Sequence, residues 1–358
     1  MKKALCLLLC LLLLLPFGVS AFAEEAKTGT LKMLAYNVSG IPLIGDFQGS
    51  VVTTTADRAA KLGALLNEAD ADFISVEEDF NGHNRLAEQR TAYPYRSFTS
   101  GGLLLGQGLN VFSRRPLYNL QRVNWKTEFG TLSGSADALA NKGFLYALME
   151  LEDGVFLHVI TLHCDAGYDP LSVRARRDNF RQLSAWIDEN LNDGRALIVQ
   201  GDFNFKFKRQ LKDDLAANLL EKSGLQDVWA LLTGDVLDPN DPAFPWEEPG
   251  DELDRVLFRS GTNVTLEPVG KTVPSLTGPN GERYTDHDPM LTEFRYTITG
   301  KDPAPETLRE PEAPNMALQT LKEIALVPFR LLQVVFGLLE LPYLIGQGID
   351  MLIRGKMP

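Results

Sequence analysis

The sequence predicts one mixed α/β or α+β domain between about Thr30 and Thr299. Short apolar runs that end in polar residues recur along this segment, a pattern typical of buried strands that stop at the rim of a sheet. Longer stretches with apolar residues at helical spacing lie between some of these runs. The sequence contains no internal repeat and no nucleotide-binding glycine loop. We therefore expect strands and helices to alternate around a shared apolar core.

The first half of the domain is expected to open with a strand that ends in Asn37. A helix should follow, because Ala59, Leu62 and Leu66 share one helical face. In chain order, we expect a strand at residues 31–36, the helix at 56–67, and strands at 73–76 and 109–112.

The second half contains a hairpin signal, because two alternating segments flank the turn Asp153-Gly154. We expect this hairpin at residues 143–151 and 155–162. The elements expected after it are a helix at 172–190, a strand at 196–199, a polar helix near 210–222, and strands at 253–258 and 290–296.

The predicted strand at 196–199 leads into Gly201-Asp202-Phe203-Asn204. Because side chains alternate along a strand, Asp202 and Asn204 would point to the same face if the strand continued. A carboxylate beside an amide suits a hydrated cation and a phosphate. An Asp/Asn turn after a core strand explains the same residues equally well.

The segment before the domain has the pattern of a secretory signal peptide at residues 1–23, with Met1-Lys2-Lys3, a leucine-rich run and Ala21-Phe22-Ala23. We therefore expect a secreted, cell-surface or periplasmic protein that keeps only one cysteine, Cys164. The formal net charge of −12 disfavours an affinity that comes from neutralising many phosphates of a nucleic acid.

A proline-rich linker at residues 300–314 separates the domain from an apolar tail at 315–354. The polar residues of the tail form one narrow helical stripe: Gln319, Lys322, Glu323, Arg330, Gln333, Glu340 and Gln347. Charges and prolines disfavour a membrane-spanning segment. We expect an interfacial helix that places the domain at a lipid surface and contributes nothing to the chemistry. Packing on the domain and an oligomer contact are the alternatives.

Polar residues suited to catalysis follow the predicted strands: Asn37, Glu78, His163, Asp165, Asp202, Asn204, Asp286 and His287. A sheet that gathers such residues at one rim assembles a site from distant parts of the sequence. Each residue alone is equally compatible with a structural role.

The order and context of these residues resemble the endonuclease/exonuclease/phosphatase superfamily of metal-dependent phosphoesterases. The matching stretches are residues 31–37, 72–78, 108–116, 142–144, 161–165, 201–204, 253–254 and 286–287. The resemblance implies a four-layer α/β/β/α sandwich, with two β-sheets face to face and helices outside. Within the superfamily, Tyr93-Pro94-Tyr95 and residues 137–146 are similar to bacterial secreted sphingomyelinases.

The chain departs from the family pattern at Glu77, Asp165, Arg255 and Thr285. None of these departures removes a catalytic group. Glu77 and Asp165 are expected to add negative charge near the site, which bears on the choice of substrate.

Phosphodiester hydrolysis needs a polarised phosphorus, a deprotonated water and a stabilised leaving oxygen. We expect Glu78, aided by Asn37, to bind Mg²⁺ or another divalent cation, because hard cations prefer oxygen ligands. His287 is the expected general base, because imidazole titrates nearest neutral pH. His163 and Asn204 are expected to donate hydrogen bonds to phosphoryl oxygens.

The remaining carboxylates are expected to support this set. The resemblance implies that a separate aspartate orients the base histidine, and Asp202 fits that position as well as a place beside the phosphate. Asp286 is expected to hold its loop and the metal or water side, and Asp165 is expected to contact substrate.

The sequence therefore favours a secreted Mg²⁺-dependent phosphodiesterase that hydrolyses a phospholipid headgroup as sphingomyelinases do. The alternatives are a secreted nuclease acting on DNA or RNA, a phosphatase of the same superfamily, and a non-enzymatic surface protein with a vestigial site. The intact set of polar residues argues against the last of these.

Overall fold

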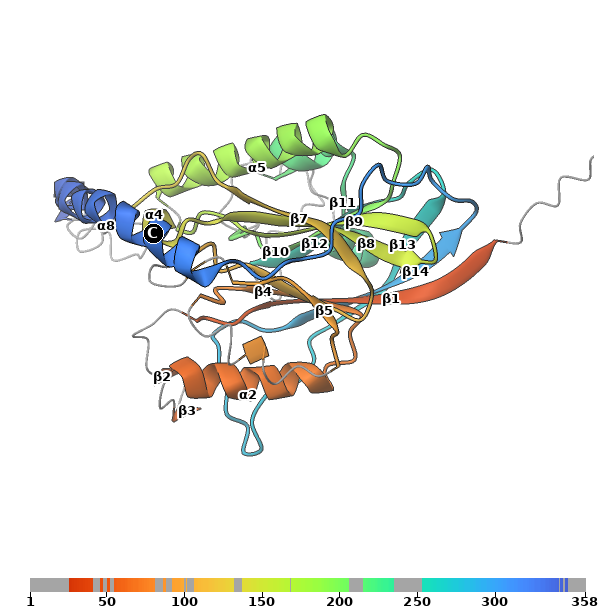
Figure 1. The fold of residues 1–358 in the computed structure, drawn as a ribbon, viewed down its shortest axis with the longest axis horizontal. Coiled ribbons are helices and arrows are strands. Elements are labelled where there is room, and N and C mark those ends of the chain that lie inside the picture. Colours follow the sequence, from red (N-terminus) through yellow and green to blue (C-terminus); the bar gives the residue numbers. More distant parts are fainter. Residues whose placement is uncertain are drawn as a thin grey trace, which may run out of the picture.

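The structure is a computed structural model that describes residues 26–40, 46–47, 50–51, 55–80, 86–87, 92–99, 101, 106–131, 137–167, 169–205, 215–234, 253–340, 342–343 and 345–346. Within these ranges, two six-stranded sheets lie face to face (Figure 1). Helix α2 (Thr55–Glu68) covers the outer face of one sheet, and helix α5 (Pro170–Asn190) covers the outer face of the other. The four-layer sandwich is thus confirmed. The predicted signal peptide lies outside the described residues.

The first sheet has the strand order β13-β14-β1-β4-β6-β5. Its central pair, β1 (Lys27–Asn37) and β4 (Phe73–Glu77), is parallel, and the register places Asn37 opposite Glu77. Glu78 therefore follows β4 beside the end of β1. The other strands are β5 (Tyr95–Arg96), β6 (Asn110–Ser113), β13 (Val264–Thr272) and β14 (Met290–Ile298).

The second sheet has the strand order β11-β12-β10-β9-β8-β7. Strands β9 (Val155–His163) and β10 (Leu197–Asp202) are parallel, and His163 lies opposite Asp202. The predicted hairpin joins β9 to β8 (Gly143–Glu152). The other strands are β7 (Leu117–Asn124), β11 (Gln226–Asp227) and β12 (Asp254–Arg259).

Three apolar clusters hold the layers together. Buried residues such as Met33, Phe73 and Ile198 fill the space between the sheets. One buried amide also crosses this space, because Gln200 Nε2 donates to the carbonyl oxygen of Leu34 at 3.0 Å and to Ser75 Oγ at 2.9 Å. A buried amide that finds its partners only in one arrangement fixes the sheets against each other.

The two outer clusters seat the helices. Helix α2 packs on the first sheet through Leu62 and Leu66, the face predicted from the sequence. Helix α5 starts at the N-cap Asp169, whose carboxylate accepts from the backbone N–H groups of Leu171 and Ser172, and it packs on the second sheet.

Several elements escaped prediction. Strand β7 (LYNLQRVN) carries mostly half-buried and polar residues, and β13 contains an irregularity between Pro268 and Gly270, so neither shows a clean apolar run. Helix α7 (Val228–Thr233) is too short to show periodicity. The predicted helix near 210–222 falls partly outside the described residues, and its described part is η3 (Ala216–Leu220) followed by α6 (Glu221–Ser223). The remaining short elements are β2 (Asp46–Phe47), β3 (Ser50–Val51) and α4 (Asp137–Ala140).

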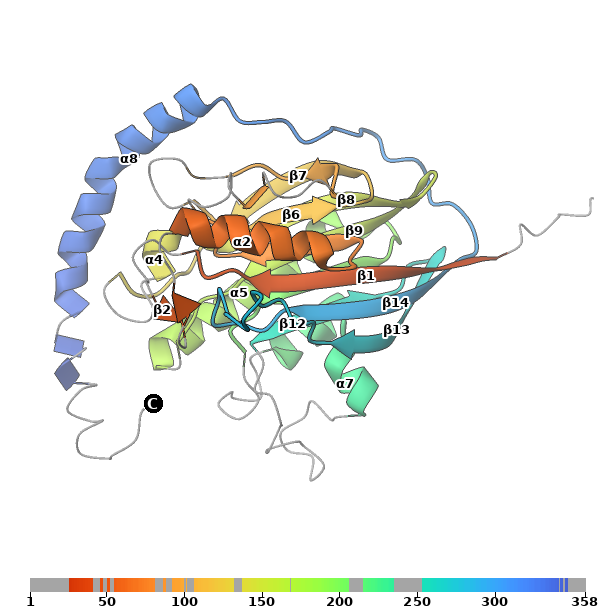
Figure 2. The same cartoon turned by 90° about the horizontal axis from the view of Figure 1, so that it is seen from below.

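The described part of the predicted tail includes helix α8 (Met316–Gly337), which continues into the turn η4 (Leu338–Glu340). Gln347, the last residue of the predicted polar stripe, lies outside the described residues. The segment before it runs along β7, where Asn119 N donates to the carbonyl oxygen of Arg309 at 2.8 Å. Figure 2 shows α8 beyond the end of the sheets toward which β1 runs. Among the described helices, none has both the length and the apolar character needed to cross a membrane.

Candidate active site

Polar residues from both sheets meet at one edge of the sandwich. Asn37 ends β1, Glu78 follows β4, His163 ends β9 and Asp202 ends β10. His287 lies just before β14. Because β1 and β4 are parallel, as are β9 and β10, the carboxyl ends of each pair meet at the same edge. The structure therefore gathers residues that the sequence placed far apart.

Asp202 lies at the centre of this group and is 1% exposed. Its Oδ2 atom accepts a hydrogen bond from Asn37 Nδ2 at 3.0 Å. The same oxygen lies 3.4 Å from His163 Nε2 and 3.8 Å from His287 Nε2. One carboxylate therefore contacts a residue from β1, a residue from β9 and the loop before β14.

Gly201 lets β10 deliver Asp202 to this position. Its backbone φ is 131°, in the region that favours glycine. A Cβ atom at this position would lie 2.2 Å from the carbonyl oxygen of Leu162 on the neighbouring strand β9. The glycine is thus required by the close approach of the two strands.

His287 is oriented by Asp254 at the start of β12. The Nδ1 atom of His287 lies 2.8 Å from Asp254 Oδ2, which leaves Nε2 facing Asp202. The orienting role that the family resemblance left open for Asp202 is therefore filled by Asp254. Sequence reasoning missed this role, although Asp254 lies in a stretch that matches the family. The role depends on the pairing of Asp254 with Asp202 across β10 and β12, which is a contact between distant segments.

The two histidines beside Asp202 have opposite pKa shifts. Burial lowers the pKa of His287, but Asp254 and Asp202 outweigh this effect and raise it to about 11. Burial, together with the charge of Lys142, holds the pKa of His163 well below its ordinary value. His163 is therefore neutral at neutral pH, whereas His287 keeps its proton until another cation reduces the field of the carboxylates.

Lys142 is a site residue that sequence reasoning gave no role. It is buried, and its Nζ lies 2.5 Å from Asp137 Oδ1 and 3.3 Å from the carbonyl oxygen of Cys164. Burial lowers the pKa of this ammonium, but Asp137 and Glu78 outweigh the effect and raise it. Lys142 therefore stays charged next to the carboxylates. A single lysine normally indicates a solvated surface, and its place in the matching stretch 142–144 was the available signal.

Glu78 and Asn37 form the oxygen-rich side of the site. Asn37 Nδ2 donates to Glu78 Oε1 at 3.1 Å as well as to Asp202, so one amide joins the two carboxylates. Glu78 has a φ of 56°, a backbone region that is costly for a glutamate. Burial raises the pKa of Glu78 despite Lys142 and the Asn37 hydrogen bond. Carboxylates that are held together at such a cost fit a hard divalent cation such as Mg²⁺.

Asp202, Asp254 and His287 offer a second set of ligand atoms, all within 4.8 Å of one another. His287 Nδ1 already contacts Asp254, so this set also serves as the orienting pair of the base. Glu78 and Asp202, joined through Asn37, are therefore the better candidates for holding a cation.

Asn204 does not share a strand face with Asp202, contrary to the prediction from a continuing strand. Strand β10 ends at Asp202, and Asn204 has a φ of 50°. Its backbone N–H donates to Asp202 Oδ1 at 2.8 Å, and its Nδ2 donates to the carbonyl oxygen of Cys164 at 3.1 Å. The alternative explanation of an Asp/Asn turn is therefore correct, and the turn keeps Asn204 beside Asp202.

Burial works against the negative charge that the sequence led us to expect from Glu77 and Asp165. Glu77 is fully buried and accepts from Thr161 Oγ1 at 3.0 Å, and burial raises its pKa well above the ordinary value. Asp165 accepts from the backbone N–H of Phe129 at 2.8 Å, and burial raises its pKa to about 9. In both carboxyls desolvation outweighs the neighbouring donors, so burial favours the protonated form.

The remaining predicted site residues lie at the edges of the group. Asp286 is exposed, and its negative charge contributes to the raised pKa of His287. Thr285 Oγ1 donates to the carbonyl oxygen of Asn37 at 2.7 Å and so attaches the loop of Asp286 and His287 to the end of β1. His163 is buried, and its Nδ1 has no hydrogen-bond partner within the described ranges.

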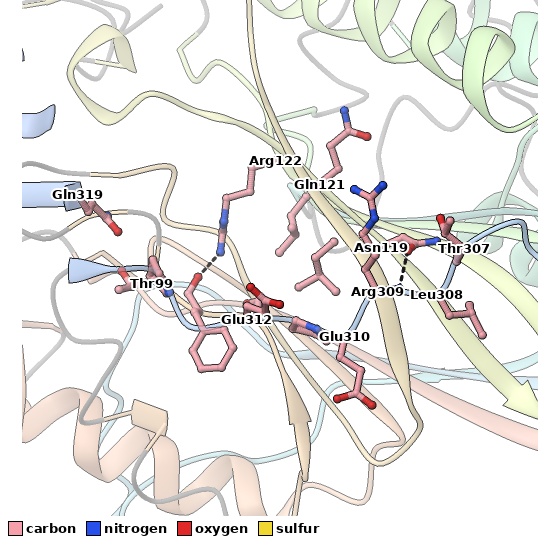
Figure 3. A pocket seen from close by; sticks show the side chains of 16 residues that line it. Thr99, Asn119, Gln121, Arg122, Thr307, Leu308, Arg309, Glu310, Glu312 and Gln319 are labelled. Atoms are coloured by element: carbon pink, nitrogen blue, oxygen red, sulfur yellow. Dashed lines mark hydrogen bonds between the residues drawn. The ribbon is translucent and has the colours of Figure 1, made fainter. Parts of the chain in front are cut away.

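A cavity of about 1130 Å³ lies elsewhere, between β7 and the segment 307–314 (Figure 3). The guanidinium of Arg122 donates to the carbonyl oxygen of Phe98 at 2.6 Å in this region. None of the polar residues gathered at the strand ends lines this cavity. It is therefore not part of the candidate active site.

Comparisons with known proteins agree with this fold. The family described as Endonuclease/Exonuclease/phosphatase family 2 matches residues 85–243. Sphingomyelinase C from Streptomyces griseocarneus is similar in structure, with 19% identity, a TM-score of 0.50, and coverage of 74% of this chain and 99% of that chain. No curated protein matches the chain.

Two further solved structures are similar to this chain over 74% of its length and 99% of theirs. A double mutant of beta toxin from Staphylococcus aureus with bound magnesium ions has 17% identity and a TM-score of 0.51. TDP2 from D. rerio, in complex with a single strand DNA product, has 17% identity and a TM-score of 0.53. At these identities the likeness concerns the fold. The family match to residues 85–243 and the shared four-layer sandwich agree with the resemblance to the endonuclease/exonuclease/phosphatase superfamily that the sequence indicates.

Proposed function

We propose that this chain is a secreted, metal-dependent phosphodiesterase that hydrolyses a phospholipid headgroup as sphingomyelinases do. One observation carries the hydrolytic part: His287 is held through Nδ1 by Asp254 at 2.8 Å, and its Nε2 faces the strand-end carboxylates. A carboxylate that fixes the tautomer of an imidazole leaves its second nitrogen to take a proton from an attacking water.

Glu78 and Asp202, joined through Asn37, would hold Mg²⁺ or another divalent cation. When bound, such a cation lowers the pKa of water and stabilises charge on phosphoryl oxygens. The magnesium ions in the similar beta toxin structure support this assignment. A cation at these carboxylates would also weaken the field that keeps His287 protonated, so that the imidazole becomes a base near neutral pH.

Charge on the substrate would be stabilised by the chain's own donors. The ammonium of Lys142 stays positive beside Glu78 and Asp202 and supplies a fixed positive charge to the site. Neutral His163 and the amide of Asn204 lie next to Asp202, where they can donate to phosphoryl oxygens as the substrate enters.

A lipid substrate is favoured over a nucleic acid by charge and by the tail. The formal net charge is −12, whereas proteins that neutralise many phosphates carry basic surfaces. The predicted signal peptide supports secretion, and the apolar helix α8 lies at the end of the sheets where β1 delivers Asn37 (Figure 2). The similar fold of sphingomyelinase C agrees with this choice.

A secreted nuclease is the second candidate, and one observation favours it. TDP2 in complex with its single strand DNA product is as similar in fold as the sphingomyelinase. A phosphatase of the same superfamily would use the same catalytic residues.

An assay of the purified mature chain, residues 24–358, with each substrate in turn and Mg²⁺ distinguishes between these activities. The substrates are sphingomyelin vesicles, vesicles with phosphatidylinositol phosphates, a phosphomonoester, and single-stranded DNA. We expect headgroup release from sphingomyelin vesicles, and a rate lower by about 10²-fold or more from the His287→Ala control. Cleavage of DNA alone would establish the nuclease, and no turnover of any substrate would contradict a hydrolytic function.

A further inference from the structure

Helix α8 contacts the domain through its polar stripe. Apart from Thr320, the less exposed residues of the helix and its following turn recur every three or four positions: Gln319, Glu323, Val327, Arg330, Gln333, Gly337 and Glu340. Arg330 Nη1 and Gln333 Nε2 both donate to the carbonyl oxygen of Ala138, at 2.8 Å and 2.9 Å. Arg330 also donates to Asn141 Oδ1. The side of the helix that faces the domain is therefore mostly polar.

The opposite face of α8 and of the turn after it is apolar and exposed. The exposed fractions are 68% for Phe329, 63% for Phe336 and 74% for Leu339. Other large apolar residues on this exposed side are Leu318, Leu321, Ile324, Leu331, Leu332 and Val335. A surface helix of a soluble domain normally buries its apolar side, so α8 is arranged in the reverse sense. A continuous exposed apolar face of this kind marks a surface that binds another apolar phase or molecule.

Helix α8 contacts the rim of the candidate active site through its polar stripe. The contacts of Arg330 and Gln333 reach α4 and Asn141, the residue before Lys142. Past the helix, Glu340 accepts from the backbone N–H of Thr131 at 3.0 Å.

A second set of contacts reaches the other side of the rim. Tyr343 donates to Asp169 Oδ1 at 2.9 Å and packs edge-on against Phe129, with 6.0 Å between ring centroids. Phe129 in turn donates its backbone N–H to Asp165. The tail is therefore joined to segments that border both Lys142 and Asp165.

We propose that the exposed face of α8 is the docking surface for a lipid bilayer, and that the polar stripe fixes this surface to the active-site rim. The polar stripe contacts the domain, so the outer face offers apolar area and few directional polar groups to a protein partner. A net charge of −12 works against a second copy of the chain and against an anionic surface, which leaves a zwitterionic bilayer. Docking itself rests on the helix; only the identity of the hydrolysed lipid rests on the proposed function.

The expectation that the tail contributes nothing to the chemistry stays a prediction, although the tail contacts the segment before Lys142. Removal of the chain after Thr299 would delete the Arg330 contacts to the segment that leads into Lys142. It would also remove the hydrogen bonds between Asn119, which lies on β7, and Arg309 in the segment before α8. Truncation therefore changes the rim as well as the membrane contact, and substitutions on the exposed face are the cleaner test.

The test compares two surface variants of the mature chain. The first carries Phe329→Gln, Leu332→Gln and Phe336→Gln on α8. The control carries Leu231→Gln on α7, because Leu231 and Leu332 are both 53% exposed. Sedimentation with phosphatidylcholine vesicles in EDTA measures docking without turnover. Loss of three apolar side chains should weaken vesicle binding by about 10²-fold or more, whereas the control should bind as the unmodified chain does.

Two further measurements separate the possible occupants of the face. We expect the triple variant to keep its melting temperature and its turnover of a soluble chromogenic phosphodiester, because the three side chains lie in solvent. Vesicle binding equal to that of the unmodified chain would overturn the proposal. So would an unmodified chain that self-associates in analytical ultracentrifugation while the variant is monomeric, since a second copy would then cover the face. Normal docking without hydrolysis of any lipid would leave the docking surface standing and remove the proposed function.

Discussion

Alanine at Glu78 or at Asp202 is expected to abolish turnover while the protein stays folded. Both carboxylates accept from the same amide of Asn37, so each supplies part of one oxygen-rich site. Removing such a group costs about 10³-fold or more in rate when the charge of the reacting phosphoryl group is stabilised there. The assay is hydrolysis of a soluble phosphodiester at saturating Mg²⁺, with Glu267→Ala, an exposed carboxylate on β13, as the matched control.

The two variants should differ in stability. Burial raises the pKa of Glu78, so its ionised form destabilises the fold, and Glu78→Ala should melt at the same or a higher temperature near neutral pH. The pKa of Asp202 is lowered despite burial, because the adjacent His163 and the positive charges of His287 and Lys142 favour the carboxylate. The ionised Asp202 carboxylate therefore stabilises the folded protein at pH values above 3.8, its pKa in the unfolded chain, and this stabilisation is lost as the pH falls. Asp202→Ala should thus melt at a lower temperature near neutral pH. Near-normal activity of either variant would show that the site lies elsewhere.

The second large effect is expected at His287 and at Asp254, the carboxylate that orients it. His287→Ala should lower the rate by roughly 10² or more, the usual scale for a lost general base. Asp254→Asn keeps the size of the side chain but replaces the carboxylate that accepts from His287 Nδ1. An imidazole held in the wrong tautomer is a poor base, so we expect a loss of about 10²-fold to 10⁴-fold for this variant.

The pH–rate profile shows whether Asp254 acts through His287. In the metal-loaded enzyme the acidic limb should follow protonation of His287, because only the neutral imidazole can accept a proton. Asp254 raises the pKa of His287, so Asp254→Asn should move that limb to lower pH. A profile that stays flat where histidines titrate, or a limb that Asp254→Asn does not move, would contradict the assigned roles.

The strand-end residues were predictable because their signals are local. An apolar run followed by a polar turn identifies the ends of β1, β4, β9 and β10 without knowledge of the partner strands. Parallel pairing then requires these ends to share an edge. The local signals identified Asn37, Glu78, His163 and Asp202 as strand-end residues, and the family resemblance assigned them to one site.

The remaining site features depend on contacts between distant segments. Asp254 opens its strand, and only the antiparallel register with β10 places it opposite Asp202. Lys142 resembles a surface lysine until the fold buries it against Asp137. The raised pKa of Glu77 follows from complete burial, which no local pattern of acidic residues reveals.

The tail likewise combines a feature that was predictable from local sequence with one that depends on contacts to distant segments. The spacing of its polar residues predicted a helix with one polar stripe, and α8 has that form. The side that would face the domain was not predictable, because burial of the apolar side is the usual outcome. The carbonyl oxygen of Ala138 and the side chain of Asn141 select the polar side instead.

The central claim is that the strand-end residues form a metal-dependent hydrolytic site, and the dependence of turnover on the cation tests it most directly. The mature chain is stripped with EDTA, assayed on a soluble chromogenic phosphodiester, and then titrated with Mg²⁺, with Glu78→Ala in parallel. We predict no turnover after stripping, saturable recovery with Mg²⁺ in the unmodified chain, and no recovery in the variant. Full turnover in the presence of EDTA would contradict the account.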